Sequence, residues 1–312
     1  MSFLTKSFLV LAGTFFLTLG STASADIIID GYTDEENDRF TNSSSFIATG
    51  LDFSGVGRRE SGPNQSASST VGASWGTLIS PNVVIGAAHA IGSPFRQYEF
   101  YADNDPNSTR VTRTEISRTR LSGTDLILVV LNARVDPFIT HYNFAQEALS
   151  ADPFDADTNS GLFNAGSFQD EVAYVFGISP ADSASTAVDQ AVGRNRVSGY
   201  IENIDFQGNV DNDSLLFARD FEGDDDFVEH ETLVQGGDSG APVFIERNGE
   251  LLLIGVNSFR DTDNTFSGIT YTGNLAEEIN SFITLNAVPE PSSVTLLVIA
   301  GLGAFVRRRR LD

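Results

Sequence analysis

The residues with the clearest chemical potential lie at 235–244, which read QGGDSGAPVF. A serine, Ser239, stands between an aspartate and a glycine in this segment. Glycine tolerates tight backbone geometry because it has no Cβ, so such a turn can hold the serine with its Oγ exposed. The N–H groups of Gly237 and Ser239 could then point at one oxygen and stabilise a developing negative charge. An ordinary glycine-rich surface turn is the alternative, since short motifs recur by chance.

A serine hydroxyl is a weak nucleophile until a neighbouring base accepts its proton, and histidine suits that role near neutral pH. The chain has three histidines. His89 follows an apolar stretch and has small neighbours, whereas His141 lies in a polar connection and His230 in an acidic loop. We therefore expect the last two to be solvated or paired locally. A carboxylate must orient the imidazole; the candidate is Asp125, which opens the apolar run 126–131, and a strand-edge carboxylate is the alternative.

Composition limits the classes of protein that this chain can represent. Its 312 residues are 41% hydrophobic, which is typical of a globular protein with one large or two small cores. The formal net charge of −23 argues against nucleic acid or an anionic membrane as a partner. The absence of cysteine excludes disulfide bonds and thiolate chemistry.

The N-terminal end has the pattern of a secretory signal peptide. Lys6 precedes an apolar run at 8–19, and the small residues Ala-Ser-Ala follow at 23–25. This order predicts cleavage that leaves a mature chain beginning near Asp26. An uncleaved membrane anchor is the alternative.

The C-terminal end combines a Pro-Glu-Pro motif at 289–291, an apolar run at 294–306 and four arginines at 307–310. The run would form only about 20 Å of helix, whereas a bilayer core is about 30 Å thick. These three parts in this order resemble the PEP-CTERM sorting tail of Gram-negative bacteria. The resemblance implies export, transient membrane contact through a short transmembrane helix, and a processing enzyme that removes the tail. A plain C-terminal tail anchor is the alternative.

The body of the chain reads as a succession of short strands. Apolar stretches bounded by turn residues predict strands at 73–79, 83–86, 100–101, 111–116, 126–131, 172–177, 196–201, 241–245, 251–258 and 268–272. Asn248-Gly249 is a strong hairpin signal. Residues 274–285 have helical spacing with Asn274 as N-cap, and residues 26–70 read as a loose segment with one short strand near 46–48. The pattern predicts an all-β fold with a terminal helix.

Three segments resemble the signature segments of trypsin-like serine proteases of the chymotrypsin fold. They are GAAHA at 86–90, TDLILVVL at 124–131 and GGDSGAPVF at 236–244, and weaker similarity extends from about 73 to 285. The resemblance implies two antiparallel six-stranded β-barrels with a site between them and a short C-terminal helix. We therefore divide the chain into a signal peptide (1–25), a loose N-terminal segment (26–72), a protease domain (73–287, its barrels divided near 136–169) and the tail (288–312).

The same resemblance implies a role for each matching residue. His89 would be the general base, Asp125 its orienting carboxylate and Ser239 the nucleophile, with the N–H groups of Gly237 and Ser239 as the oxyanion hole. Ser258 would place a hydroxyl near Asp125.

The substrate pocket would include Leu233 at its base, Ser258 and Arg260 at its rim. A leucine in place of a carboxylate disfavours basic P1 residues. We expect an apolar P1 residue, with an acidic one as the second choice.

The sequence also departs from the family pattern. The cysteines of many members are missing, and Ala241 stands where a glycine is usual. No Ile-Val-Gly-Gly-like start is visible, so Asp238 lacks the N-terminal ammonium that pairs with this aspartate in much of the family. The alternatives are activation by cleavage somewhere before Ala73, for example at Arg58-Arg59, and an arginine that takes the place of the ammonium.

These observations lead to a secreted serine endopeptidase that acts on protein or peptide substrates. The alternatives are an inactive surface or binding protein with the same fold, and an adhesin or matrix component held by the tail. The acidic loops at 220–226 and 261–264 have the carboxylates that Ca²⁺ prefers but lack EF-hand spacing. We therefore read them as solvated, with Ca²⁺ binding as the alternative, and assign neither a metal nor a cofactor.

Overall fold

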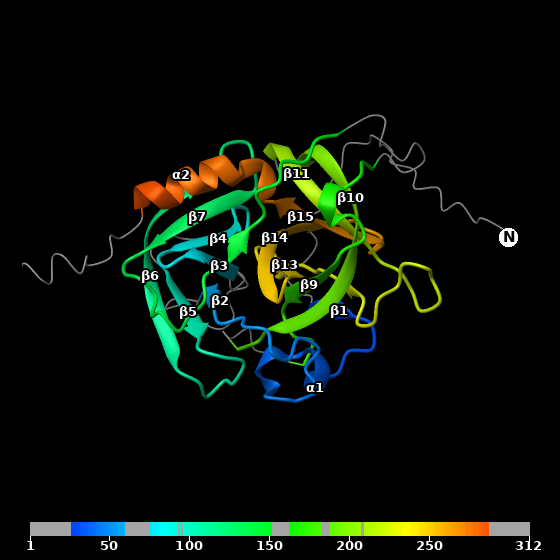
Figure 1. Ribbon diagram of the computed structural model, residues 1–312, viewed down its shortest axis with the longest axis horizontal. Coiled ribbons are helices and arrows are strands. Elements are labelled where there is room, and N and C mark those ends of the chain that lie inside the picture. The colour runs from blue at the N-terminus through cyan, green and yellow to red at the C-terminus, as the bar shows by residue number, and fades with distance from the viewer. Residues whose placement is uncertain are drawn as a thin grey trace, which may run out of the picture.

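The computed structural model describes residues 26–59, 75–92, 94, 96–151, 162–181, 188–206 and 209–286. Within these ranges almost all regular structure is β-strand, and the strands close into two barrels that lie side by side (Figure 1). The predicted signal peptide and C-terminal tail fall outside the described residues.

The first barrel closes in the order β2-β3-β4-β7-β6-β5. Its strands are β2 (Val56–Arg59), β3 (Trp75–Ser80), β4 (Val83–Ala87), β5 (Gln97–Tyr101), β6 (Arg110–Arg120) and β7 (Leu126–Leu131). All residues of β3, β4 and β7 are buried, which explains their almost continuous apolar sequences.

The second barrel follows the order β13-β9-β10-β11-β15-β14 and closes through the pairing of β13 with β14. Its strands are β9 (Val172–Gly177), β10 (Ala191–Phe206), β11 (Asn209–Ala218), β13 (Pro242–Arg247), β14 (Glu250–Arg260) and β15 (Phe266–Tyr271). The β13–β14 hairpin turns at Asn248 and Gly249, whose φ angles are +57° and +80°. Positive φ at both positions is the geometry that makes Asn-Gly a hairpin signal. The prediction of two antiparallel six-stranded barrels is confirmed.

Aromatic side chains fill the space between the barrels. Phe53 meets Phe176 with ring centroids 4.9 Å apart, and Tyr142 meets Phe244 at 4.7 Å. All four are buried in one core cluster that contains residues from both barrels. Such contacts hold the barrels together by apolar burial and ring packing in a chain without disulfides.

The C-terminal helix α2 (Ala276–Asn286) leaves the second barrel and lies along the first (Figure 1). Ile279 is fully buried, and Asn82 Nδ2, in the β3–β4 turn, donates to the carbonyl of Asn286 over 2.9 Å. The prediction of Asn274 as helix N-cap was wrong. Asn274 lies in a 3-10 turn (Gly273–Leu275), and its side chain holds the backbone of Leu149 through bonds of 2.7 and 3.0 Å.

The N-terminal segment is more ordered than the sequence indicated. It contains β1 (Ile28–Ile29), α1 (Asp34–Asn37), a 3-10 turn (Arg39–Thr41) and the barrel strand β2. Residues 46–48 form no strand, yet Phe46 and Ala48 are buried in the core between the barrels. The order of this segment was not predicted because it comes from packing against the barrels and not from a periodic pattern in its own sequence.

Three further short elements complete the described chain. They are β8 (Asn143–Phe144), which runs parallel to β14, a 3-10 turn (Gly166–Phe168), and β12 (Thr232–Leu233), which pairs with β1.

Candidate active site

Two neighbouring strands of the first barrel bring His89 and Asp125 together. β4 ends at Ala87 and β7 begins at Leu126, and these two residues are direct partners in the antiparallel ladder. The segments that continue from this point therefore lie side by side. His89 Nδ1 is 2.6 Å from Asp125 Oδ2, and the His89 backbone N–H donates to Asp125 Oδ1 over 2.9 Å.

Asp125 is fully buried and held from several directions. Ser258 Oγ donates to Asp125 Oδ2 over 2.7 Å, and the Asp125 N–H donates to Asn212 Oδ1 over 2.9 Å. An ionised carboxylate in this position accepts a hydrogen bond from the Nδ1–H of His89, which favours the tautomer whose Nε2 carries the lone pair of a base. Sequence reasoning found Ser258 but missed Asn212, which lies in β11, a strand with no local signal of this contact.

The turn that carries Ser239 packs against the end of β4. Gly237 and Gly240 have φ angles of +117° and +86°, which residues with a side chain rarely adopt. A Cβ on Gly240 would lie 2.9 Å from the backbone N of Ala87, so only glycine permits this approach. Gly240 directly follows Ser239, and Ala87 is two residues before His89, so the serine turn approaches the segment that carries the histidine.

The N–H groups of the serine turn differ in whether they have a backbone acceptor within the described residues. The N–H of Gly240 donates to Asn257 O over 2.8 Å, and that of Ala241 to Asp238 O over 3.0 Å. The N–H groups of Gly237 and Ser239 have no acceptor in the described part of the chain. Ser239 is partly exposed. Within the described ranges, no hydrogen bond joins its Oγ to His89.

The side chain of Asp238 fixes the serine turn by accepting hydrogen bonds from the backbone. It is fully buried, and its carboxylate accepts the N–H of Ile178 over 2.7 Å and that of Gln235 over 2.6 Å. Desolvation raises the pKa of Asp238 to about 8 despite these bonds, while the Arg58 guanidinium acts to lower it and Asp26 to raise it. Arg58, and not an N-terminal ammonium, is thus the cation that lowers the pKa of Asp238 in this structure.

The position of Arg58 also bears on the cleavage hypothesis. β2 is a barrel strand paired with both β3 and β5. A cut at Arg58-Arg59 would open the barrel, so the geometry disfavours this bond as an activation site.

The predicted pocket residues occupy different settings. Leu233 is fully buried in β12, opposite Ile28 of β1. Ser258 is engaged with Asp125, as described above. Arg260 is held by its own turn, because Nη1 donates to Asn264 Oδ1 over 2.5 Å and to Asp261 O over 3.2 Å.

The other two histidines lie apart from this cluster. His141 is exposed, as expected, and partial desolvation and Arg134 lower its pKa. His230 is buried, with 7% of its surface exposed and a φ of +64°, so the prediction of a solvated or locally paired side chain was wrong. The loop is attached to β10 at this point, where the Arg194 N–H donates to the His230 carbonyl over 2.9 Å.

The acidic loops use their carboxylates internally. Asp261 accepts hydrogen bonds from Thr265 and from the Phe266 N–H, and Asp224 from the Phe221 N–H. The described residues contain no group of three or more His, Asp or Glu side chains arranged to hold a metal ion.

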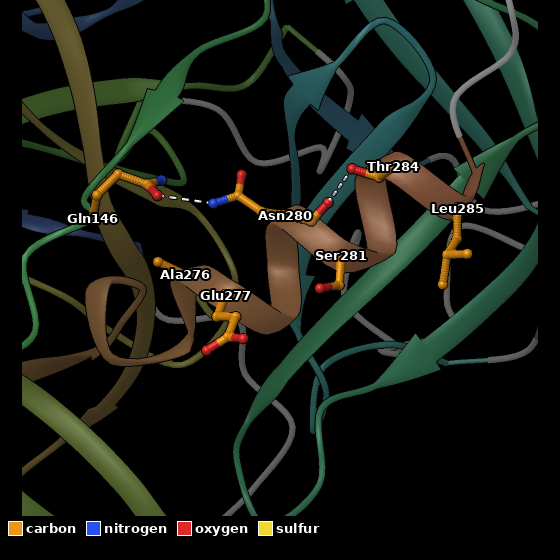
Figure 2. A pocket seen from close by; sticks show the side chains of 7 residues that line it. All are labelled: Gln146, Ala276, Glu277, Asn280, Ser281, Thr284 and Leu285. Carbon is orange, nitrogen blue, oxygen red and sulfur yellow. Dashed lines mark hydrogen bonds between the residues drawn. The ribbon is translucent and has the colours of Figure 1, made fainter.

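A hollow lies along α2, and neither His89, Asp125 nor Ser239 lines it (Figure 2). It is lined by Gln146, Ala276, Glu277, Asn280, Ser281, Thr284 and Leu285. It contains no base paired with a nucleophile, so it is not a candidate site for this chemistry. No helix in the described ranges is long and apolar enough to cross a membrane, and the expected transmembrane helix at 294–306 lies outside them.

Comparisons with known proteins agree with the architecture. The model of the PEP-CTERM protein-sorting motif matches residues 287–310, and a search of curated proteins found no match. A mutant of human heparin binding protein (CAP37) aligns with a TM-score of 0.50 and 16% identity, over 77% of this chain and 95% of that one. The inactive form of Rv3671c protease aligns with a TM-score of 0.44 and 18% identity, over 73% and 88% of the two chains.

At such identities the likeness shows the fold and not the activity. The sorting motif indicates an exported protein. The chain is therefore a two-barrel protein of the chymotrypsin fold with a PEP-CTERM sorting motif at its C-terminal end.

Proposed function

We propose that this protein is an exported serine endopeptidase that hydrolyses peptide bonds through His89, Asp125 and Ser239. The observation that carries the proposal is the buried Asp125 carboxylate, which lies 2.6 Å from His89 Nδ1 beside the glycine-rich turn of Ser239. A carboxylate kept dry and fixed by further donors is well suited to orient a catalytic base.

The chemistry follows from these positions. His89 Nε2 accepts the Ser239 proton while Oγ attacks the substrate carbonyl, and the N–H groups of Gly237 and Ser239 stabilise the oxyanion. The imidazolium then donates its proton to the leaving amine, and an acyl-enzyme remains. Water activated by His89 hydrolyses the ester and restores the serine.

The missing hydrogen bond between Ser239 and His89 favours a second candidate, an inactive surface or binding protein with the same fold. Catalytic hydrogen bonds are often long in free enzymes and tighten only when substrate binds. The complete set of groups around Asp125 therefore supports the enzyme more strongly than this gap supports the inactive form.

A fluorophosphonate probe separates the two candidates, because it reacts with an activated serine and not with an ordinary hydroxyl. We expect covalent labelling of the parent at Ser239 and none of the Ser239→Ala protein. The matched control is Ser281→Ala, which removes an exposed hydroxyl on α2 and should leave labelling unchanged. A folded parent that the probe does not modify would sink the proposal.

Specificity is the finer part of the proposal. Leu233 has no charge to pair with a basic P1 side chain, and Arg260 is already held by its own turn. We propose a preference for an apolar P1 residue, with an acidic one as second choice. Peptide-library cleavage dominated by Lys or Arg at P1 would contradict it.

Two further partners belong to the proposal. A signal peptidase would remove residues 1–25, and a membrane-bound sorting enzyme would act at the C-terminal motif after transient membrane contact of the tail. Nucleic acid is not an expected partner, given the net charge of −23.

A further inference from the structure

The only tryptophan of the chain holds the backbone of the serine turn. Trp75, in β3, has 1% of its surface exposed, and its Nε1–H donates to the carbonyl of Gly237 over 3.2 Å. Gly237 has a φ of +117° and no side chain, so its own backbone preferences do not fix its orientation. The indole therefore supplies a restraint that the local sequence lacks.

Arg58 supports the indole from the neighbouring strand. It is the direct partner of Trp75 in the β2–β3 ladder, and its Cζ lies 4.8 Å from the indole centroid. Arg58 Nη1 donates to the carbonyl of Asp189 over 2.6 Å and is 3.6 Å from Asp189 Oδ2. A buried guanidinium with this pairing cannot move without leaving a buried carboxylate uncompensated.

Hydrogen bonds also connect Asp189, the partner of Arg58, to the segment that holds Asp238. Asp189 Oδ1 accepts the N–H of Ser179, and Asp238 Oδ1 accepts the N–H of the preceding residue, Ile178. Asp238 and Gly237 are adjacent, so one turn is held through a carboxylate and through a carbonyl at once. The peptide that joins Gly237 to Asp238 is fixed at both ends, because its carbonyl accepts from Trp75 and its N–H donates to the carbonyl of Gln235 over 3.2 Å. The Gly237 N–H belongs to the preceding peptide, so this fixed unit limits the Gly237 φ and ψ rotations that would turn it away.

We propose that Trp75, braced by Arg58, is a positioning residue for the oxyanion hole: its bond to the Gly237 carbonyl fixes the peptide that follows Gly237 and so restrains the backbone rotations that orient the Gly237 N–H. The inference rests on the proposed function, because an oxyanion forms only during acyl transfer. Neither residue touches the substrate, and both act from the first barrel on a turn of the second.

The decisive variant is Trp75→Phe, which keeps an aromatic ring against Arg58 and removes the N–H donor. Loss of an oxyanion donor lowers kcat by roughly 10²–10³-fold, and a misdirected donor should cost a part of that. We expect the rate of fluorophosphonate labelling and kcat for a peptide substrate to fall by about 10-fold or more, with KM within about 2-fold of the parent.

A matched control separates positioning from general destabilisation. Phe176→Leu disturbs the packing around Trp75, whose ring centroid is 6.4 Å from that of Phe176, but keeps the indole donor. We expect it to lower the unfolding midpoint at least as much as Trp75→Phe while labelling stays near the parent rate. Because Trp75 is the only tryptophan, its single indole N–H signal in NMR should exchange slowly with solvent in the parent and in Phe176→Leu.

The outcomes distinguish this inference from the function on which it rests. A reactive parent with a reactive Trp75→Phe protein overturns the positioning role and leaves the protease proposal in place. Equal rate losses in both variants also overturn it, since packing alone would then explain the effect. An unreactive, folded parent overturns both proposals.

Discussion

At the scale of single residues, the site depends on Ser239 and His89 acting as a unit. Ser239→Ala should abolish peptide hydrolysis, and His89→Ala should cost nearly as much, because a nucleophile without its base is hardly better than none. The double variant should be no slower than either single variant, since the effects of such groups are not additive. Rate constants and circular dichroism of the three proteins test this.

The two remaining histidines provide internal controls. His141 is exposed and His230 is buried in a loop that contacts β10. His141→Ala should retain the parent rate. Loss of hydrolysis in that protein, with His89→Ala active, would show that the base is misassigned.

Asp125 gives a graded prediction at the same scale. Asp125→Asn can no longer favour the Nδ1–H form of His89, so kcat should fall by about 10⁴-fold. Ser258→Ala removes one donor to that carboxylate and leaves the others, so it should cost far less, about 10-fold at most. Equal losses in both variants would contradict the orienting role of the carboxylate.

The sequence predicted those residues that sit in compact motifs and missed those that meet only after folding. His89, Asp125 and Ser239 each lie next to an apolar strand or a glycine-rich turn. Asn212 reaches Asp125 across 87 positions, and Trp75 reaches Gly237 across 162. No local pattern marks such contacts, because they are set by how the two barrels pack.

At the scale of elements, strands with a clear local apolar pattern were predicted, and strands that depend on long-range pairing were missed. β7 and β9 are continuous apolar runs, and their predicted bounds match the observed strands. β11 was missed because its first half is polar, Asn-Val-Asp-Asn-Asp-Ser, although Asn212 and Ser214 are fully buried. Its pairing with β10 and β15 overrides its weak local preference for a strand.

The serine turn should make stability depend on pH through Asp238. Its pKa is raised to about 8 in the folded protein, above the ordinary value of 3.8, mainly by burial. The folded state therefore binds the proton more tightly than the unfolded state, so this contribution is complete below the unfolded pKa of 3.8, falls as pH rises from there, and is lost once pH passes the folded pKa of about 8.

Urea unfolding of the parent and of Asp238→Asn at pH 6 and pH 8 measures that contribution. The free energy of unfolding of the parent should fall relative to the variant by about 2 kcal/mol between these pH values, at up to about 1.4 kcal/mol per pH unit. The comparison between the two proteins cancels other titrating groups, including the buried Glu231, whose pKa is also raised to about 8. A parallel pH dependence in both proteins would contradict a raised pKa at Asp238.

At the scale of the whole molecule, both barrels lie between the predicted signal peptide and the sorting motif, so we expect the fold to form without either end. The last described helix ends at Asn286, where its carbonyl accepts the Asn82 amide of the first barrel. The body therefore completes its packing before the sorting motif, which matches residues 287–310. The net charge of −23 for the full chain favours solubility of the body that the proposed removal of the tail would release.

The last prediction concerns the mature species. Proline lacks an N–H and restricts the residue before it, so the Pro-Glu-Pro motif at 289–291 should be extended and accessible to a processing enzyme. The apolar run after it is too short to span a bilayer comfortably, and the four arginines at 307–310 should keep the end at the cytoplasmic face. The mature protein should therefore lack both residues 1 to about 25 and roughly everything after Pro289.

Intact-mass analysis of protein isolated from the native host measures both cuts in one experiment. A recombinant chain of residues 26–286 provides the control, and it should fold and react with the fluorophosphonate probe as the native protein does. Every element of both barrels lies within these residues, so removal of the ends should leave the unfolding midpoint unchanged. A membrane-embedded species that retains Arg307–Arg310 would instead establish the tail anchor, because an uncleaved basic end fixes the chain in the bilayer.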